Sequence, residues 1–234
     1  MVAKMSKLPN NFIYLDEIDN RIISDIRYAG DLNFVGERIR GYEANRAIML
    51  KPVAQSLSKV QDIISQDGFL LVVYDAYRPT TAVEHFVDWA NDTANQSMKK
   101  DFYQFINKED VFSLGFISKR SAHSRGIAVD LTIIPKERAL YPLSSINKTS
   151  RKLNDGREFI FIDDNTLDMG SHFDLFDLAS YHDTDLISKA HSDNRNYLKR
   201  VMIENGFQPY SKEWWHYSLK DPINETIFFD FAVK

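Results

Sequence analysis

The sequence predicts an α+β fold in which a largely antiparallel sheet is flanked by helices. Strand-like and helix-like segments follow one another without the strict βαβ alternation of a parallel sheet. Near the C-terminus, segments 214–219 and 226–233 look like two strands joined by a short loop that contains proline. No repeat, low-complexity tract or linker divides the chain, so we expect residues 1–234 to form a single domain.

The first segments predict a strand, a helix and a second strand. Over 22–28 the even-numbered residues (Ile, Ser, Ile, Tyr) alternate with the odd-numbered ones (Ile, Asp, Arg), which suggests an early strand. Pro52 is well placed to begin a helix, because apolar residues then recur at helical spacing up to Ile64. Asp67-Gly68 should end that helix. The continuous apolar run 69–74 predicts a buried strand.

The middle of the chain predicts two helices followed by a strand. A hydroxyl at Thr80-Thr81 can cap a helix with one apolar side. Another helix is expected around 100–106. After a turn at Gly126, segment 127–134 is typical of a strand.

The last third of the chain predicts a turn, a strand and a helix before the C-terminal strands. The Asn-Asp-Gly turn at 154–156 precedes an apolar strand at 159–162. Ser192 should cap a helix that Gly206 ends. Together these elements complete the α+β order.

Composition excludes several classes of protein. The chain has 234 residues, of which 44% are hydrophobic and 26% charged, as in ordinary globular proteins. Its net charge of −4 gives no basic surface for nucleic acid, and no apolar run approaches the ~20 residues that cross a bilayer. The N-terminus lacks the apolar centre of a secretory signal, so we expect a cytoplasmic location. A signal removed before this numbering begins would make the location periplasmic.

Two short segments supply the side chains of a hydrolytic metal site. One runs from Ser121 to Asp130 and contains His123; the other is Glu213-Trp214-Trp215-His216. Two imidazoles and one carboxylate can hold a divalent metal and leave a position open for water, as in catalytic zinc sites. The remaining carboxylate, Glu213, can accept a proton from that water. The chain has no cysteine, which disfavours a closed structural zinc site.

The expected geometry makes specific demands on the backbone. In the strand from 127, alternate residues are apolar, so Asp130 should point away from them, between small neighbours. A bend at Gly126 could bring the His123 ring back toward Asp130. Glu213 and His216 would face opposite sides of a straight strand, so the chain must bend near the tryptophans.

A simpler interpretation of these residues is also open. A histidine near an aspartate is most often a surface pair, and Glu-x-x-His can lie on a solvated face. The ten-residue pattern and the adjacent tryptophans, which can exclude water from a site, favour the metal site. Of the other histidines, His182 is the best rival ligand, and the rest are expected to be structural or exposed: His85, His172 and His191.

Arg78 follows the buried strand at 69–74, where ligand sites commonly lie. Its structural role would be an ion pair with Asp75. Its functional role would be to stabilise a developing oxyanion with a fixed positive charge. The sequence leaves both roles open.

Taken together, these segments closely resemble the D-alanyl-D-alanine dipeptidases, zinc hydrolases typified by the vancomycin-resistance dipeptidase. The resemblance extends through nearly the whole chain. It is carried by Tyr14 to Ile18, Tyr77-Arg78-Pro79, Ser121 to Asp130, Met169 to Asp174, Glu213 to Tyr217 and Phe229 to Phe231. The fold it implies is that of the D,D-peptidases and hedgehog-like domains.

The resemblance implies a role for each candidate residue. One zinc ion per chain would bind to His123, Asp130 and His216. Glu213 would be the general base, and Arg78 would stabilise the transition state. The residues that would shape the dipeptide pocket are Ser121, Asp174, Tyr28 and Phe86, with Asp75 as a further substrate-binding candidate. Asp174 would pair with the substrate's ammonium group.

The implied activity is hydrolysis of the D-alanyl-D-alanine dipeptide to two D-alanine molecules. The partner would be this small dipeptide, with no nucleic acid and no membrane; the sequence leaves the oligomeric state open. The alternatives are a D,D-carboxypeptidase that trims peptidoglycan stem peptides and a non-catalytic zinc module. The connection 131–168 is longer than is usual in the family and could reshape the pocket entrance, so the sequence leaves the substrate range open.

Overall fold

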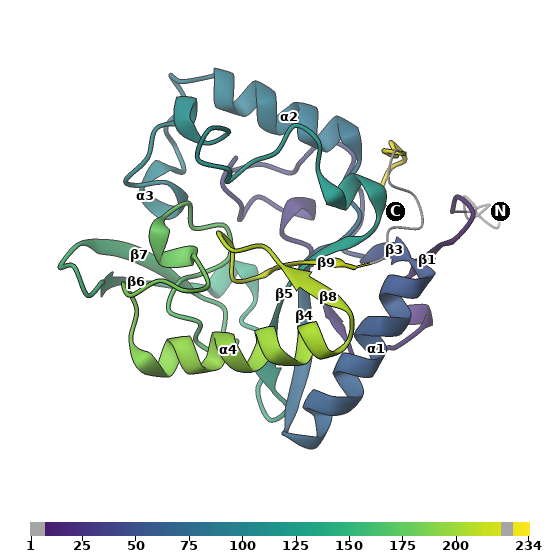
Figure 1. Ribbon diagram of the computed structural model, residues 1–234. Coiled ribbons are helices and arrows are strands. Elements are labelled where there is room, and N and C mark those ends of the chain that lie inside the picture. Colours follow the sequence, from purple (N-terminus) through teal and green to yellow (C-terminus); the bar gives the residue numbers. More distant parts are fainter. Residues whose placement is uncertain (1–7, 221–226) are drawn as a thin grey trace.

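A five-stranded sheet forms the centre of the computed structural model, which describes residues 8–220 and 227–234 (Figure 1). Its strand order is β2-β4-β5-β9-β8. The bounds are β2 (Ile23–Ser24), β4 (Phe69–Asp75), β5 (Ala128–Pro135), β9 (His216–Leu219) and β8 (Phe207–Pro209). Only β2 and β4 are parallel, and the other pairs are antiparallel. The prediction of an α+β fold with a largely antiparallel sheet is confirmed.

Strand β5 lies in the middle of this sheet and is buried along its whole length. In the register of the sheet, Asp130 lies opposite His216 of β9 on one side and Asp75 of β4 on the other. The register of β4 shifts between Val73 and Asp75, and this irregularity brings Asp75 into line. Residues from three strands therefore meet at one level of the sheet.

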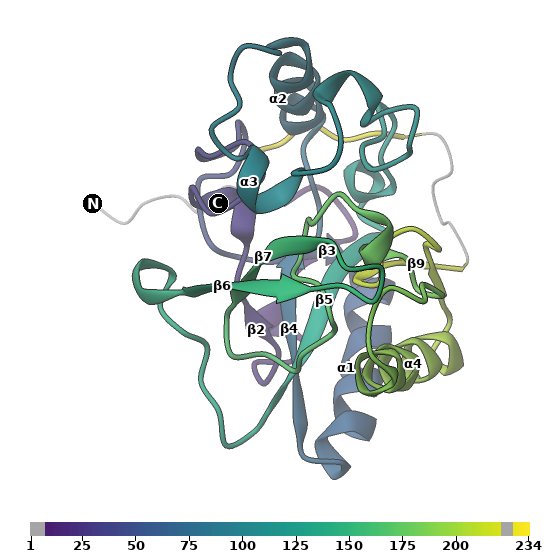
Figure 2. The same cartoon turned by 90° about the vertical axis from the view of Figure 1, so that its left-hand side faces the viewer.

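Helices α1 (Lys51–Gln66) and α4 (Lys189–Glu204) contact each other and pack on β4 and β8 respectively, so they cover one face of the sheet (Figures 1 and 2). Helix α2 (Thr80–Asn91) lies on the opposite side of the molecule, together with the short α3 (Lys99–Phe102). Among the residues that the structure describes, no helix is long and apolar enough to cross a membrane.

Two small sheets complete the fold. Strand β1 (Phe12–Tyr14) pairs with β3 (Ile48–Leu50), and β6 (Asn147–Lys152) forms a hairpin with β7 (Glu158–Asp163). The predicted turn at 154–156 closes this hairpin, with Gly156 at a φ of 90°. Strand β6 was not expected, because its residues are polar and mostly exposed and so lack the alternation that marks a half-buried strand.

The predictions of strands at 22–28 and 226–233 are largely wrong. Within 22–28 only β2 is extended, and a 3-10 helix follows at Arg27–Ala29, where Arg27 turns inward to bind Asp25 and Asp164. The segment predicted at 226–233 forms a single bridge, between Val233 and Tyr42, within its described part; residue 226 lies outside the described residues. Its aromatic rings pack on the rings of Phe12 and Tyr77 instead.

The helix starts also differ from the predictions. The side chain that caps α4 is Ser188, which accepts the His191 N–H, and Ser192 lies inside the first turn. No threonine caps α2; the Asp230 carboxylate accepts hydrogen bonds from the Thr81 N–H and hydroxyl instead. Helix α3 ends at Phe102 rather than at 106. In α2, a residue distant in sequence supplies the cap, which local patterns cannot reveal.

Candidate active site

His123 lies in a 3-10 helix, Ala122–Arg125, directly before β5. The Ser121 side chain caps this helix by accepting the His123 N–H at 3.2 Å. Gly126 then adopts a left-handed φ of 73°, which turns the chain into the strand. The expected bend at Gly126 is therefore present, and it brings His123 Nε2 to 3.3 Å from Asp130 Oδ1.

The backbone fixes the orientation of the His123 ring. Its Nδ1 lies 2.6 Å from the Ala76 carbonyl oxygen, which can only accept a hydrogen bond, so Nδ1 carries the proton. The other nitrogen, Nε2, then faces His216 and Asp130 with its lone pair free. This is the arrangement by which proteins present a histidine to a metal ion.

Glu213 and His216 approach the same space because the chain turns between them. The His216 N–H donates to the Glu213 carbonyl at 3.2 Å, and β9 begins only at His216. The predicted bend near the tryptophans is confirmed. Trp214 and Trp215 are both buried, so this turn is held firmly against the core.

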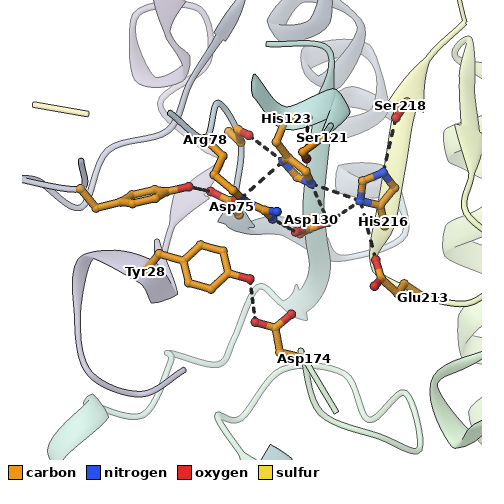
Figure 3. A network of polar contacts seen from close by, with 12 residues as sticks. Tyr28, Asp75, Arg78, Ser121, His123, Asp130, Asp174, Glu213, His216 and Ser218 are labelled. Carbon is orange, nitrogen blue, oxygen red and sulfur yellow. Dashed lines mark hydrogen bonds and ion pairs between the residues drawn. The ribbon is translucent and has the colours of Figure 1, made fainter. Parts of the chain in front are cut away.

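His123, Asp130 and His216 form a group that could hold a metal ion, with one ligand atom from each residue within 4.8 Å of the others. His216 Nδ1 lies 2.9 Å from Asp130 Oδ1 and 3.1 Å from His123 Nε2 (Figure 3). The carboxylate of Glu213 stands at the edge of this group, with Oε2 3.9 Å from His216 Nδ1. The four side chains singled out in the sequence thus converge.

Arg78 lies against this metal-ligand group (Figure 3). Its Nε donates to Asp75 at 2.9 Å, and its Nη2 lies 3.5 Å from Asp130 Oδ2. The guanidinium also stands over the rings of Tyr28 and Phe86, 5.2 Å from each centroid. Burial alone would lower the pKa of Arg78, but Asp75 and the other neighbouring groups hold it well above its usual value. A permanent positive charge is therefore fixed in place.

Tyr28 and Asp174 form the wall of the site below the metal ligands in Figure 3. The Tyr28 hydroxyl donates to Asp174 Oδ2 at 2.8 Å. Asp174 holds a left-handed φ of 62°, which is uncommon for a residue other than glycine. Such strain is often found where a side chain must point into a site.

Buried carboxyl groups are crowded together at this site. Burial raises the pKa of the Glu213 and Asp174 carboxyls well above their usual values, and the charge of Asp130 adds to the effect for both. Burial would also raise the pKa of Asp130, but His123 and His216 reverse the shift and lower it. Because a buried charge is costly unless it is paired, several buried carboxylates together require a positively charged partner.

A cavity of about 260 Å³ opens onto these groups, and we call it the site cavity. Its lining includes all three metal-binding candidates, Glu213 and Arg78, together with four of the five substrate-binding candidates: Ser121, Asp174, Tyr28 and Phe86. A space of this size fits a small ligand.

Asp75, the fifth candidate, has a different place. It is fully buried and does not line the site cavity, where a substrate would lie. It accepts hydrogen bonds from Arg78 and from the Tyr42 hydroxyl, the latter at 2.6 Å. It also lies 3.4 Å from His123 Nδ1. Asp75 therefore orients Arg78 and His123, and sequence reasoning missed Tyr42 because no motif marks it.

The long connection 131–168, which could have reshaped the entrance, contributes no residue to the lining of the site cavity. The β6–β7 hairpin packs on a separate apolar cluster that includes Leu175 and Ile187. The rival ligand His182 is buried outside the metal-ligand group.

Comparison with known proteins decides the family. The family model described as D-ala-D-ala dipeptidase matches residues 9–141 and 162–234, which is most of the chain. The chain belongs to the D-alanyl-D-alanine dipeptidase family. It is therefore a metallopeptidase, as the sequence predicted. The unmatched residues 142–161 fall within the connection expected to be longer than in other D-alanyl-D-alanine dipeptidases.

Three curated D-alanyl-D-alanine dipeptidases resemble the chain over nearly their whole length. The protein from Enterococcus faecium is 35% identical over 95% of this chain and 98% of its own. The protein from Enterococcus faecalis is 34% identical over 97% of this chain and 100% of its own. The protein from Streptomyces coelicolor is 32% identical, with the same coverage of 97% and 100%.

One solved structure is also similar, at 14% identity and a TM-score of 0.39 over 76% of each chain. It is a mutant of the vancomycin-resistance D,D-pentapeptidase VanY in complex with Zn(II).

Proposed function

We propose that this protein hydrolyses the D-alanyl-D-alanine dipeptide to two D-alanine molecules and that one zinc ion serves the reaction. The observation that carries the proposal is the convergence of His123, Asp130, His216 and Glu213 in one small cavity that also contains Asp174. Membership of the dipeptidase family supports the same substrate.

The donor set fits zinc. Ligand atoms bonded at ~2.0–2.1 Å around a tetrahedral zinc ion lie about 3.3 Å apart. The observed separations between His123 Nε2, His216 Nδ1 and Asp130 Oδ1 are 2.9, 3.1 and 3.3 Å. The crowding of buried carboxyl groups also suits a divalent cation. When bound there, zinc supplies a Lewis acid that polarises the peptide carbonyl and makes water nucleophilic near neutral pH.

Glu213 would act as the proton carrier. Its carboxylate faces the metal-ligand group and is not held in an ion pair with lysine or arginine among the described residues. It can take a proton from the attacking water and deliver it to the amine that leaves. A cation beside it favours the charged form of Glu213, which is the form that accepts the proton.

Arg78 would bind the oxyanion that develops on the attacked carbonyl. Asp75 and the rings of Tyr28 and Phe86 hold the guanidinium in place before substrate arrives. Because this charge need not reorganise during the reaction, it stabilises the transition state by about 3 kcal/mol in comparable sites.

Asp174 would recognise the substrate's free ammonium group. Its carboxylate is buried and receives a hydrogen bond from Tyr28, but no ion pair with a described residue neutralises it. An ammonium group placed against it would supply the missing charge. A longer peptide would have to place its uncharged backbone there, which favours the dipeptide over stem peptides.

The deciding experiment measures free D-alanine after incubation of zinc-loaded protein with D-Ala-D-Ala, L-Ala-L-Ala and a stem pentapeptide. Release from the first alone is the expected result, and release from the pentapeptide alone would identify a D,D-carboxypeptidase. A protein that binds zinc but hydrolyses none of the three would be a binding module. Glu213→Ala should keep its zinc and lose nearly all turnover, whereas His123→Ala should lose both.

A further inference from the structure

The site cavity contains a second arginine, Arg120, which stands one position before Ser121. Among the residues that the structure describes, three carboxylates line this cavity, those of Asp130, Asp174 and Glu213, and two arginines line it with them. The charge of Arg78 is already offset by Asp75 and Asp130. Arg120, unlike Arg78, forms no ion pair with a residue of 8–220 or 227–234.

Local contacts hold Arg120 between the site cavity and a neighbouring cavity, and Arg120 lines both. Its guanidinium carbon lies 4.8 Å from the centre of the Phe228 ring, and this stacking limits the freedom of the side chain. Its backbone is fixed by Ser118, whose hydroxyl accepts the Arg120 N–H at 3.2 Å and donates to the Arg120 carbonyl at 3.0 Å. An exposed arginine held in this way needs little further ordering to bind a carboxylate.

The position of Arg120 matches the far end of a dipeptide. In Figure 3, Ser121 lies beside His123, whereas Asp174 lies on the other side of Asp130. A dipeptide whose ammonium binds Asp174 has its peptide bond at the metal ligands and its carboxylate beyond them. Two residues span at most about 7 Å, so that carboxylate falls inside the site cavity on the Ser121 side. Arg120 adjoins this side.

We propose that Arg120 binds the C-terminal carboxylate of the substrate and so selects peptides with a free carboxyl end. The inference rests on the proposed function, since it takes the direction of the dipeptide from Asp174 and the metal ligands. Guanidinium and carboxylate can form two parallel hydrogen bonds, which an amide or ester end cannot reproduce. Arg120 would therefore be a determinant of specificity rather than of the chemical step.

The test compares hydrolysis of D-Ala-D-Ala with that of its C-terminal amide. In the wild type, kcat/KM should favour the free acid; in Arg120→Gln this preference should fall about tenfold, mainly through a higher KM. Arg120→Lys should restore part of the preference because it restores the charge. An unchanged acid-to-amide ratio in Arg120→Gln would overturn the proposal while leaving the dipeptidase activity established.

Lys119 provides the matched control. It is the adjacent exposed cation, but its ammonium lies over the Phe112 ring at 5.3 Å. Both residues line the neighbouring cavity, and only Arg120 of the two also lines the site cavity. Lys119→Gln removes the same charge and should leave the acid-to-amide ratio unchanged. An equal loss in both variants would mean that general surface charge, and not Arg120, attracts the substrate.

A binding measurement separates this inference from the proposed function. If the zinc-loaded wild type hydrolyses no dipeptide, the proposed function fails, and calorimetric titration with D-Ala-D-Ala and its amide replaces kinetics. Weaker binding of the acid to Arg120→Gln, with unchanged binding of the amide, would support the carboxylate role. Equal binding of both peptides to the wild type would overturn it.

Discussion

The Tyr28 hydroxyl donates a 2.8 Å hydrogen bond to Asp174 although 146 positions separate the two residues. Both side chains are buried, and the rings of Phe34, Phe86 and Phe173 surround the phenol. The bond therefore fixes the carboxylate in the wall of the site cavity. Because burial raises the pKa of Tyr28 well above its usual value, the phenol stays a donor at all physiological pH values.

Removal of this hydroxyl should weaken recognition of the ammonium group. Tyr28→Phe keeps the ring packing and removes one hydrogen bond to a charged acceptor, so kcat/KM for the dipeptide should fall about tenfold. Steady-state kinetics on D-Ala-D-Ala would measure this. The fold and the zinc content should not change, and a variant as active as the wild type would show that Tyr28 does not support Asp174.

Arg78→Lys should reduce kcat by about 100-fold or more, with a smaller effect on KM. Lysine keeps the charge but cannot direct two nitrogens at Asp75 and Asp130 as the guanidinium does. Comparison of kcat and KM for both proteins provides the measurement. Arg46→Lys, at an exposed pair with Asp16, is the control and should behave as the wild type. A change confined to KM in Arg78→Lys would assign Arg78 to substrate binding alone.

Gly126→Ala should destabilise the protein by about 2–4 kcal/mol. Gly126 has a φ of 73°, and a Cβ atom there would meet the Phe12 ring at 2.4 Å. Gly68→Ala is a matched control, because Gly68 has a φ of 85° but nothing within 4 Å of the added Cβ atom. It should cost only about 1 kcal/mol, the price of the left-handed conformation.

Urea denaturation gives both free energies of unfolding. Zinc titration adds a second readout, since the turn at Gly126 carries His123 toward the other ligands. Zinc affinity should fall in Gly126→Ala and stay unchanged in Gly68→Ala. Equal losses of stability in the two variants would show that the contact with Phe12 is easily relieved.

The sequence predicted which side chains converge in the site cavity but not the residues that hold them in place. Two short segments contain these side chains, His123 and Asp130 in one and Glu213 and His216 in the other, and their residue types and spacing are typical of a metal site. The pair between Asp75 and Arg78 could be predicted, because three positions separate them, but the second partner of Asp75, Tyr42, lies 33 positions away in a segment with no motif. Such a contact joins segments that are distant in sequence, and only three-dimensional packing sets it.

The fold shows the same division between local and distant effects. Helix α1 and strand β4 were predicted closely, because apolar periodicity and local stop signals define them. Ser188 and Ser192 are both able to cap a helix, and only the hydrogen bond to His191 distinguishes them. The segment after 226 is rich in aromatic residues like a strand, but stacking of Phe231 on Tyr77, with centroids 4.0 Å apart, takes the place of strand pairing.

The protein should become less stable as the pH is lowered, because two histidines, His172 and His182, are buried in their neutral form. Burial lowers the pKa of each to about 3, against an ordinary value of 6.5. Below pH 6.5 the unfolded chain binds a proton at these positions and the folded chain does not, until the pH reaches about 3. The free energy of unfolding therefore decreases across this window, by up to about 1.4 kcal/mol per pH unit for each histidine.

His172→Phe isolates one of these contributions. His172 lies among the rings of Phe102, Phe159 and Phe161, so phenylalanine suits the site and cannot titrate. Urea denaturation of the two proteins in chelator, at intervals from pH 7 to pH 4, should show a shallower decline for the variant, because its unfolded state no longer gains that proton. Parallel curves would show that the folded protein protonates His172 as readily as the unfolded chain does. A chelator is needed since zinc release at low pH would otherwise add its own dependence to both curves.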